Sequence, residues 1–133
     1  MVADGRKNIL VVDDNFDVRR LLKKVLEIAG YDVSEAVDGE DALRSVEGRV
    51  PDLILMDIRL PGQYDGLETT GRLKDDARLQ RVPIVALTAS VLERDRQQAR
   101  VAGCSGFIAK PVDISTLPGL VETFLTRGAM APR

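Results

Sequence analysis

The hydrophobic positions of the chain follow two alternating patterns. Short aliphatic runs of four or five residues fit buried strands, and longer stretches with apolar residues three or four positions apart fit amphipathic helices. The clearest helical face consists of Val18, Leu21, Leu22, Val25 and Ala29. Gly30 follows and is placed to end that helix. This alternation predicts an α/β fold in which helices cover both faces of a parallel sheet.

Strands and helices are expected in turn along the chain, five of each. The predicted strands are 8–12, 32–36, 53–56, 83–87 and 106–109. The predicted helices are 18–29, 39–46 after an Asp38 cap, 67–74, 92–102 and 117–125. Because the body of the chain shows no repeat or linker, we expect one three-layer α/β/α domain at 8–127, with short tails at 1–7 and 128–133.

The composition narrows the chemistry that the chain can perform. Its 133 residues contain no histidine, which excludes Ser-His-Asp catalysis, histidine-ligated zinc and a phosphohistidine on this chain. Lysine and arginine number 19 against 21 acidic residues, so no basic patch indicates a nucleic acid. No apolar run approaches the ~20 residues of a membrane span, so we expect a cytoplasmic protein without a membrane partner. The single cysteine, Cys104, cannot form an internal disulfide.

Chemically active residues stand at the ends of the predicted strands. Asp13 and Asp14 follow the first strand, Asp57 the third, Thr88 the fourth and Lys110 the fifth. An aspartate at such a place, taken alone, is typical of a turn or a helix cap. In an open parallel sheet, however, ligands bind in the crevice outside the carboxyl ends of the strands. The joint occurrence of these residues therefore predicts a functional site.

The charges at this site favour a bound cation. Three neighbouring carboxylates repel and raise one another's pKa unless a cation joins them. Magnesium fits because it is a hard ion that prefers oxygen ligands. Three aspartates, one Mg²⁺ and Lys110 sum to a charge of about zero, which leaves the site able to accept a phosphoryl group of about −2. We therefore expect Mg²⁺ as the cofactor.

The ordered motifs resemble those of response-regulator receivers, the phosphoacceptor domains of two-component signalling and phosphorelays. The matching segments are LVVDDN at 10–15, LILMDIRLPG at 53–62, DGLE at 65–68, VALTAS at 85–90 and FIAKP at 107–111. The resemblance covers nearly the whole chain and is to the single-domain, chemotaxis-regulator-like type. It implies a flavodoxin-like doubly wound sheet with strand order 2-1-3-4-5.

The resemblance also implies a role for each site residue. Asp57 is the expected nucleophile, which takes a phosphoryl group from a histidine of a kinase or of a histidine phosphotransfer protein. Asp14 and Asp57 are expected to bind Mg²⁺ directly with the backbone carbonyl of Arg59, and Asp13 partly through water. Lys110 is expected to neutralise phosphoryl oxygens.

Two residues form the switch that the resemblance implies. The Thr88 hydroxyl is expected to bind a phosphoryl oxygen after transfer, and Phe107 stands where the family has an aromatic residue coupled to that movement. An alternative for Phe107 is an ordinary core aromatic. Downstream proteins are expected to bind the face formed by the fourth helix, the fifth strand and the fifth helix of a monomer or weak dimer.

Several positions depart from the common receiver pattern. The loop at 62–64 is one residue longer, which either alters access to the site or is a tolerated surface insertion. Arg59 and Ser90 stand where the family tunes attack of water on the aspartyl phosphate, and neither carries a carboxamide or a carboxylate. We therefore expect slow dephosphorylation. Pro118 indicates that the last regular helix starts near Leu117.

Three other functions fit parts of the sequence. One is a receiver that belongs to a larger hybrid kinase. Another is a small Mg²⁺ phosphohydrolase with an aspartate nucleophile, although the usual D-x-D pair fails because Arg59 stands two residues after Asp57. The third is a receiver-like module that never takes phosphate, but all five site positions carry the expected residue types. We expect a signalling protein rather than an enzyme.

Overall fold

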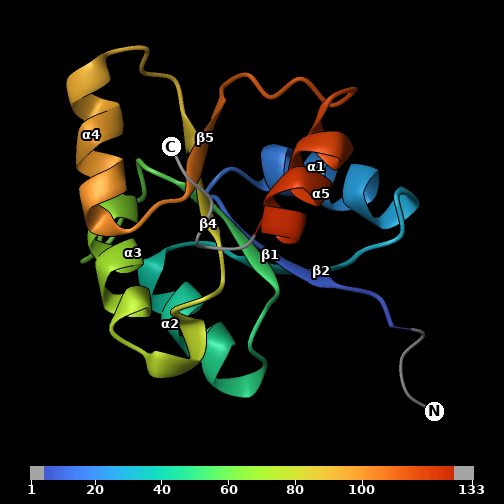
Figure 1. Cartoon of the computed structure of the whole chain (residues 1–133), viewed down its shortest axis with the longest axis horizontal. Coiled ribbons are helices and arrows are strands. Elements are labelled where there is room, and N and C mark those ends of the chain that lie inside the picture. The colour runs from blue at the N-terminus through green and yellow to red at the C-terminus, as the bar shows by residue number, and fades with distance from the viewer. Residues whose placement is uncertain (1–4, 128–133) are drawn as a thin grey trace.

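The computed structural model describes residues 5–127 and shows a parallel sheet between two layers of helices (Figure 1). The strands are β1 (Asn8–Val12), β2 (Asp32–Ala36), β3 (Leu53–Asp57), β4 (Ile84–Thr88) and β5 (Gly106–Ala109). The helices are α1 (Phe16–Ile28), α2 (Gly39–Gly48), α3 (Gly66–Lys74), α4 (Glu93–Ala102), α5 (Leu117–Arg127) and the short 3-10 helix η1 (Ala77–Leu79). The sheet order β2-β1-β3-β4-β5, with every neighbouring pair parallel, confirms the predicted flavodoxin-like topology.

The sheet is buried on both faces. In β1, Leu10 and Val12 face a core under α2, α3 and α4, whereas Ile9 and Val11 face a second core under α1 and α5. Figure 1 shows these two helical layers on opposite sides of the sheet. Because both faces are covered, the central strands are unbroken apolar runs rather than alternating ones. Polar chemistry is therefore left to the ends of the strands.

Two strands extend one residue further than predicted. Asp57 is the last residue of β3 and Thr88 is the last of β4, because strand pairing continues to both positions. Beyond the strand, Ile58 N still donates to the Leu87 carbonyl at 3.2 Å. The sheet itself, rather than a loop, therefore fixes the backbone at both residues.

Polar side chains set where the first two helices begin. Asn15 caps α1 by accepting a hydrogen bond from Val18 N at 3.0 Å, so this helix begins at Phe16, earlier than predicted. Asp38 caps α2 as predicted, and its Oδ1 accepts a hydrogen bond from Asp41 N at 2.8 Å. These bonds satisfy backbone donors that have no partner within the helix.

The buried stripe of α1 differs from the predicted face at Leu21 and Ala29, which are both exposed. Arg19, Leu22 and Leu26 are the buried residues of this helix, whereas Leu21 is 46% exposed. Leu21 precedes Leu22 by one residue, which places it about 100° away around the helix. The core-facing side therefore carries a charged residue, Arg19, which requires hydrogen-bond partners beneath the helix.

The last helix begins at the residue that the proline predicted. Leu117 is the first residue of α5, and Pro118 is the second. Backbone N–H groups in the first turn of a helix have no intrahelical partner, so a proline there removes no hydrogen bond. The proline is therefore accommodated in the first turn of α5, and the helix continues to Arg127.

Two expectations concern the ends of the chain and membranes. Residues 1–4 and 128–133, which belong to the predicted tails, lie outside the described residues, so the tails stay a prediction. The helices within residues 5–127 are too short and too polar to span a bilayer.

The close approach of α5 to β5 gives a testable prediction. A Cβ added to Gly106 would lie 2.3 Å from the Phe124 ring. We expect Gly106→Ala to lower the free energy of unfolding by about 1–3 kcal/mol, because the ring or the helix must shift. Urea unfolding followed by circular dichroism measures the loss.

Gly119→Ala, in the first turn of α5, is the matched control. An added Cβ at Gly119 meets nothing within 4 Å, and alanine favours a helix over glycine. This variant should keep wild-type stability or gain up to ~1 kcal/mol. If Gly106→Ala were as stable as the wild type, the close packing of α5 on β5 would be wrong.

Candidate functional site

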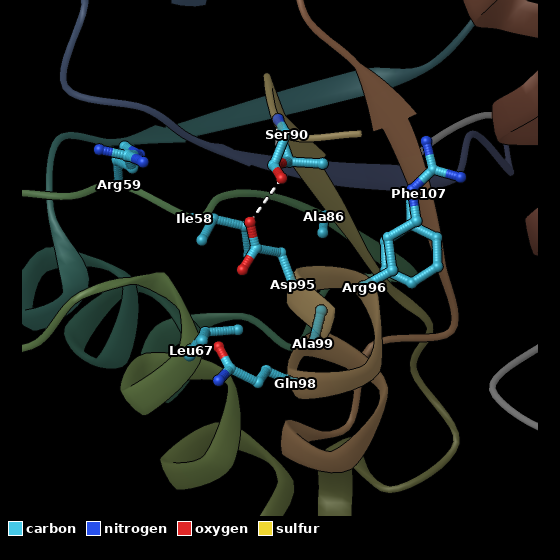
Figure 2. A pocket seen from close by; sticks show the side chains of 11 residues that line it. Ile58, Arg59, Leu67, Ala86, Ser90, Asp95, Arg96, Gln98, Ala99 and Phe107 are labelled. Carbon is cyan, nitrogen blue, oxygen red and sulfur yellow. Dashed lines mark hydrogen bonds between the residues drawn. The ribbon is translucent and has the colours of Figure 1, made fainter. Parts of the chain in front are cut away.

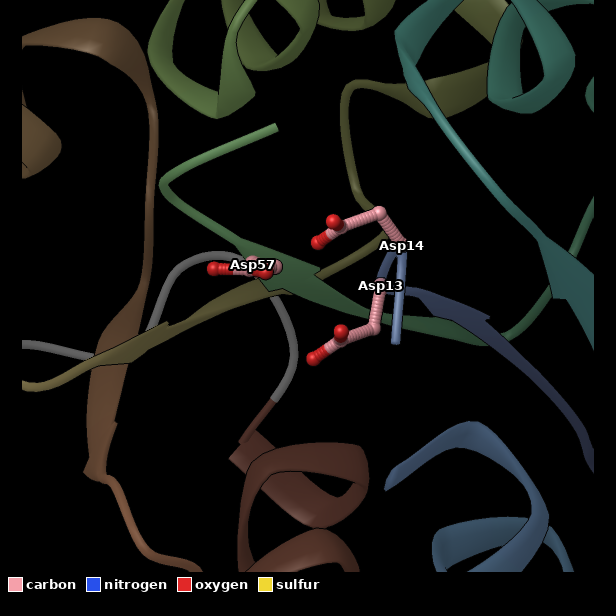
Figure 3. Close-up of side chains that lie close together, drawn as sticks. All are labelled: Asp13, Asp14 and Asp57. Carbon is pink, nitrogen blue, oxygen red and sulfur yellow. The ribbon is translucent and has the colours of Figure 1, made fainter. Parts of the chain in front are cut away.

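Three aspartates meet at the carboxyl ends of two neighbouring strands (Figure 3). Asp13 and Asp14 directly follow β1, and Asp57 ends β3, the strand beside it. One carboxylate oxygen from each aspartate lies within 4.8 Å of the others. Asp13 is 0% exposed and Asp57 is 5% exposed, whereas Asp14 is open to solvent. The structure therefore brings the predicted acidic residues together and buries two of them.

Asp13 is held by three neighbouring segments. Asn15 N donates to its Oδ1 at 2.9 Å, and its own N–H donates to the Ala36 carbonyl of β2 at 3.1 Å. The buried Arg19 side chain donates from Nη1 to the Asp13 carbonyl at 2.8 Å and from Nε to Glu35 Oε1 at 3.0 Å. The sequence pattern did not identify Arg19 as a site residue. One feature of the sequence could have indicated that Arg19 is buried: it stands three residues before Leu22, on the apolar face of the predicted helix.

Lys110 joins the two buried carboxylates. It follows β5, and its Nζ lies 3.1 Å from Asp13 Oδ2 and 3.3 Å from Asp57 Oδ2. Its backbone N–H donates to the Thr88 carbonyl at 2.9 Å. Burial alone lowers the pKa of Lys110, but hydrogen bonding to Asp13 and the charge of Asp57 outweigh burial and raise this pKa above its ordinary value. Lys110 is therefore a stable cation between two carboxylates.

Burial makes Asp57 costly to ionise. Desolvation raises the pKa of Asp57 above its ordinary value, and the charge of Asp13 adds to the rise. The N–H of Arg59, which donates to Asp57 Oδ1 at 3.0 Å, lowers this pKa again, as does Lys110, without cancelling the rise. Further positive charge near Asp57 would therefore stabilise the site.

The residues of this cluster fit a magnesium ion. Three carboxylates and one ammonium leave a charge of about −2, which a divalent cation balances. The three carboxylates offer oxygens within 4.8 Å of one another, and oxygens are the ligands that a hard cation such as Mg²⁺ prefers. Asp14 is open to solvent, so water can complete the coordination shell.

The predicted switch residues surround a cavity beside β4. Thr88 lies one step beyond Leu87, the β4 residue that is paired with Asp57. Thr88, Ser90 and Phe107 all line a cavity of about 120 Å³ that α4 partly covers (Figure 2). The hydroxyl oxygen of Thr88 accepts a hydrogen bond from Ser90 N at 3.0 Å. Phe107 therefore lines the same cavity as Thr88 and also packs against the edge of the core as a partly buried side chain.

The longer loop after β3 is attached to two helices. Gln63 N donates to Glu40 Oε2 on α2 at 3.3 Å. The Arg72 guanidinium on α3 lies 4.1 Å from the centroid of the Tyr64 ring. These contacts hold the loop against the surface of α2 and α3, which favours a tolerated insertion over altered access to the acidic cluster.

Comparison with known proteins agrees with this geometry. The sequence profile of the response regulator receiver domain matches residues 9–122. The chain belongs to the response regulator receiver family. Receivers are signalling proteins rather than enzymes in the usual sense, so the acidic cluster at 13, 14 and 57 is the pocket of a two-component signalling protein.

Curated relatives match the receiver over nearly their whole length. The polar-differentiation response regulator DivK of Brucella ovis is 38% identical over 117 residues, which cover 88% of this chain and 92% of DivK. DivK of Brucella abortus matches to the same extent. The receiver is therefore similar to a response regulator that consists of little more than this domain.

Solved structures confirm the fold. A putative response regulator from Chloroflexus aurantiacus is 33% identical with a TM-score of 0.86, over 92% of the receiver and 99% of that chain. The chemotaxis response regulator CheY4 of Vibrio cholerae is 27% identical with a TM-score of 0.85, over 89% of the receiver and 98% of that chain. The receiver domain of a signal transduction histidine kinase from Syntrophus aciditrophicus is 31% identical with a TM-score of 0.82, over 90% of each chain.

The raised pKa of Asp57 predicts how stability depends on pH without Mg²⁺. Between the ordinary value of 3.8 and the raised pKa, the folded protein binds more protons than the unfolded chain, so stability falls as pH rises through that window. We expect Asp57→Asn at pH 7 to raise the melting temperature by a few degrees. The gain should shrink as the pH is lowered towards 3.8. Calorimetry of the wild type and of Asp57→Asn over a range of pH, with a chelator present, measures the gain in melting temperature and its decrease.

Glu47→Gln is the control for this measurement. Glu47 is an exposed carboxylate on α2, away from the acidic cluster, and its replacement should change the melting temperature little at any pH. An Asp57→Asn protein that melts at or below the wild-type temperature at pH 7 would contradict the cost assigned to burying Asp57.

Proposed function

We propose that the receiver accepts a phosphoryl group on Asp57 from a histidine of a kinase or a histidine phosphotransfer protein, and then signals by binding another protein. The observation that carries this proposal is the pairing of the buried Asp57 with Lys110 at 3.3 Å, beside two further carboxylates. A nucleophile, an adjacent cation and a set of oxygen ligands are the parts that phosphoryl transfer needs. Membership of the receiver family supports a histidine kinase as the partner.

The transfer step needs no acid or base from the receiver. A carboxylate oxygen of Asp57 attacks phosphorus in line with the P–N bond of the phosphohistidine. The O–P bond forms as the P–N bond breaks, and the electron pair of that bond stays on the imidazole nitrogen. Lys110 stabilises negative charge on the phosphoryl oxygens, while the Arg59 N–H orients Asp57 through Oδ1. A chain without histidine can therefore perform this chemistry.

Asp13, Asp14, Asp57 and the backbone carbonyl of Arg59 are the groups that would hold Mg²⁺. When bound there, the ion supplies positive charge that offsets repulsion among the carboxylates and the incoming phosphoryl group. Arg19 anchors the backbone of Asp13 through its carbonyl, which keeps this ligand in place. The exposed Asp14 leaves the site accessible to a partner carrying the phosphohistidine.

The signalling step follows from differential binding of the phosphoryl group. Thr88 and Lys110 would contact its oxygens in one arrangement of the receiver better than in the other, which shifts the population towards that arrangement. Phe107 has no hydroxyl and would follow Thr88 by packing alone. The output surface would be α4, β5 and α5, where Val101 is 78% exposed and Leu120 is 38% exposed.

The nucleophile assignment predicts the outcome of labelling. With acetyl phosphate and Mg²⁺, the receiver should gain one phosphoryl group, which intact-protein mass spectrometry detects. Asp57→Asn and removal of Mg²⁺ by a chelator should each reduce labelling by at least ~100-fold, because the first removes the nucleophile and the second removes the balancing charge.

Asp17→Asn provides the matched control, since Asp17 is an exposed aspartate in the first turn of α1, near the site in sequence. This variant should be labelled like the wild type. Equal Mg²⁺-dependent labelling of the wild type and Asp57→Asn would exclude Asp57 as the phosphoacceptor.

The residues near the phosphoryl group predict slow dephosphorylation. The Ser90 hydroxyl donates to Asp95 and accepts from Leu92 N at 3.1 Å, so it is not free to orient water. The Arg59 side chain is exposed and has no hydrogen-bond acceptor. After removal of the donor, the label should persist for minutes or longer with Mg²⁺ present.

Arg59→Asn should shorten this lifetime several-fold, because a carboxamide can orient the attacking water. Mass spectrometry over time measures both proteins. A lifetime of seconds in the wild type would contradict the prediction.

A further inference from the structure

A chain of hydrogen bonds joins the first turn of α4 to Thr88. Thr88 Oγ1 accepts from Ser90 N at 3.0 Å. The Ser90 hydroxyl accepts from Leu92 N at 3.1 Å and donates to a carboxylate oxygen of Asp95 in a short hydrogen bond (Figure 2). Leu92 is the N-cap position of α4 and provides no side-chain cap. Ser90 and Asp95 together therefore hold the start of α4.

The same helix also reaches the fifth strand. The Arg96 guanidinium lies 5.5 Å from the centroid of the Phe107 ring, and the Arg100 guanidinium lies 5.4 Å from it. α4 is thus connected to the end of β4 through Ser90 and to β5 through Phe107. The cavity of about 120 Å³ lies beside these side chains. Packed interiors resist movement, so this space makes a shift of Thr88 or Phe107 less costly.

We propose that Asp95 is a positioning residue for Thr88 and acts through Ser90. The hydrogen-bonded series Thr88, Ser90 and Asp95, which we name the β4–α4 latch, holds the arrangement in which Asp57 is paired with Lys110. To bring the Thr88 hydroxyl to a phosphoryl group on Asp57, the bond from Ser90 N must break or the whole latch must move with it. The position of α4 is thereby coupled to the state of Asp57.

The strength of the latch sets how readily a phosphoryl group is bound. The Ser90 hydroxyl donates to a charged acceptor, which makes this bond stronger than one between neutral groups. Asp95 is half-buried, so water competes for its carboxylate only in part. Any interaction that stabilises the latched arrangement lowers the fraction of molecules that can bind the phosphoryl group. The apparent dissociation constant for that group rises by the same factor. Removing Asp95 should therefore tighten binding.

The inference rests on the proposed phosphorylation of Asp57, and a binding experiment separates the two. The probe is beryllium fluoride, an analogue of the phosphoryl group, titrated into the receiver with Mg²⁺ and followed by NMR. Asp95→Ala and Ser90→Ala should each lower the apparent Kd about three- to tenfold. The double variant should gain no more than Ser90→Ala alone, because that substitution already removes the Ser90–Asp95 bond together with the bond from Leu92 N. Asp95→Asn keeps an acceptor for the Ser90 hydroxyl but loses the charge, so its apparent Kd should fall between those of the wild type and Asp95→Ala.

Glu93→Gln is the matched control, because it removes the same charge from the same helical turn. Glu93 pairs with Arg100 and not with Ser90. The apparent Kd of Glu93→Gln for beryllium fluoride should equal that of the wild type. A second readout needs no analogue: amide hydrogen exchange in the first turn of α4 should be faster in Asp95→Ala and Ser90→Ala than in Asp95→Asn or Glu93→Gln.

The outcomes distinguish the two proposals. If the wild type binds the analogue and Asp95→Ala binds it no more tightly, the latch is wrong while phosphorylation of Asp57 stands. Additive effects of the Ser90 and Asp95 substitutions would also overturn the latch, since residues that share one hydrogen bond must be coupled. If the wild type does not bind the analogue, the proposed function fails, and unchanged amide exchange in Asp95→Ala would then overturn the latch separately.

Discussion

The site of the receiver is built around two buried carboxylates, Asp13 and Asp57, which lie at neighbouring strand ends with Lys110 between them. Two carboxylates removed from water lose solvation and repel each other, and both effects oppose folding. Lys110, at 3.1 and 3.3 Å from the two carboxylates, supplies a single positive charge. The pKa of Asp57 consequently stays above its ordinary value. This shortage of positive charge favours a divalent cation and suits Asp57 to phosphoryl chemistry.

Close backbone contacts keep the acidic side of the site rigid. Gly66 lets the chain after β3 turn back over the strand end, where an added Cβ would lie 2.2 Å from the Asp57 carbonyl oxygen. Gly39 lets α2 approach α3, where an added Cβ would lie 2.1 Å from Thr69 Oγ1. Neither contact leaves space for a side chain. A nucleophile held in this way needs little reorganisation during transfer.

The opposite side of the site is held differently. Thr88 ends the rigid strand β4, but the connection to α4 depends on hydrogen bonds of Ser90 and Asp95 beside a cavity. Such bonds between partly exposed side chains contribute less than buried packing and open more readily. The receiver thus combines an acidic side fixed by close backbone packing with a helix whose start is held by side-chain hydrogen bonds. A switch controlled by a phosphoryl group requires both, since one part must bind the group and the other must respond.

Sequence pattern was sufficient for the fold class and for the positions of the site, because doubly buried strands are unbroken apolar runs and each active residue stands at a strand end. The pattern did not distinguish Asp13 from Asp14, although one is buried and the other exposed. Nor did it reveal Arg19 beneath its helix or the bond from Ser90 to Asp95. These features depend on which side chains meet once separate elements pack together. The periodicity of a helix or strand describes the faces of one element at a time. Contacts between separate elements were therefore established only by the tertiary structure.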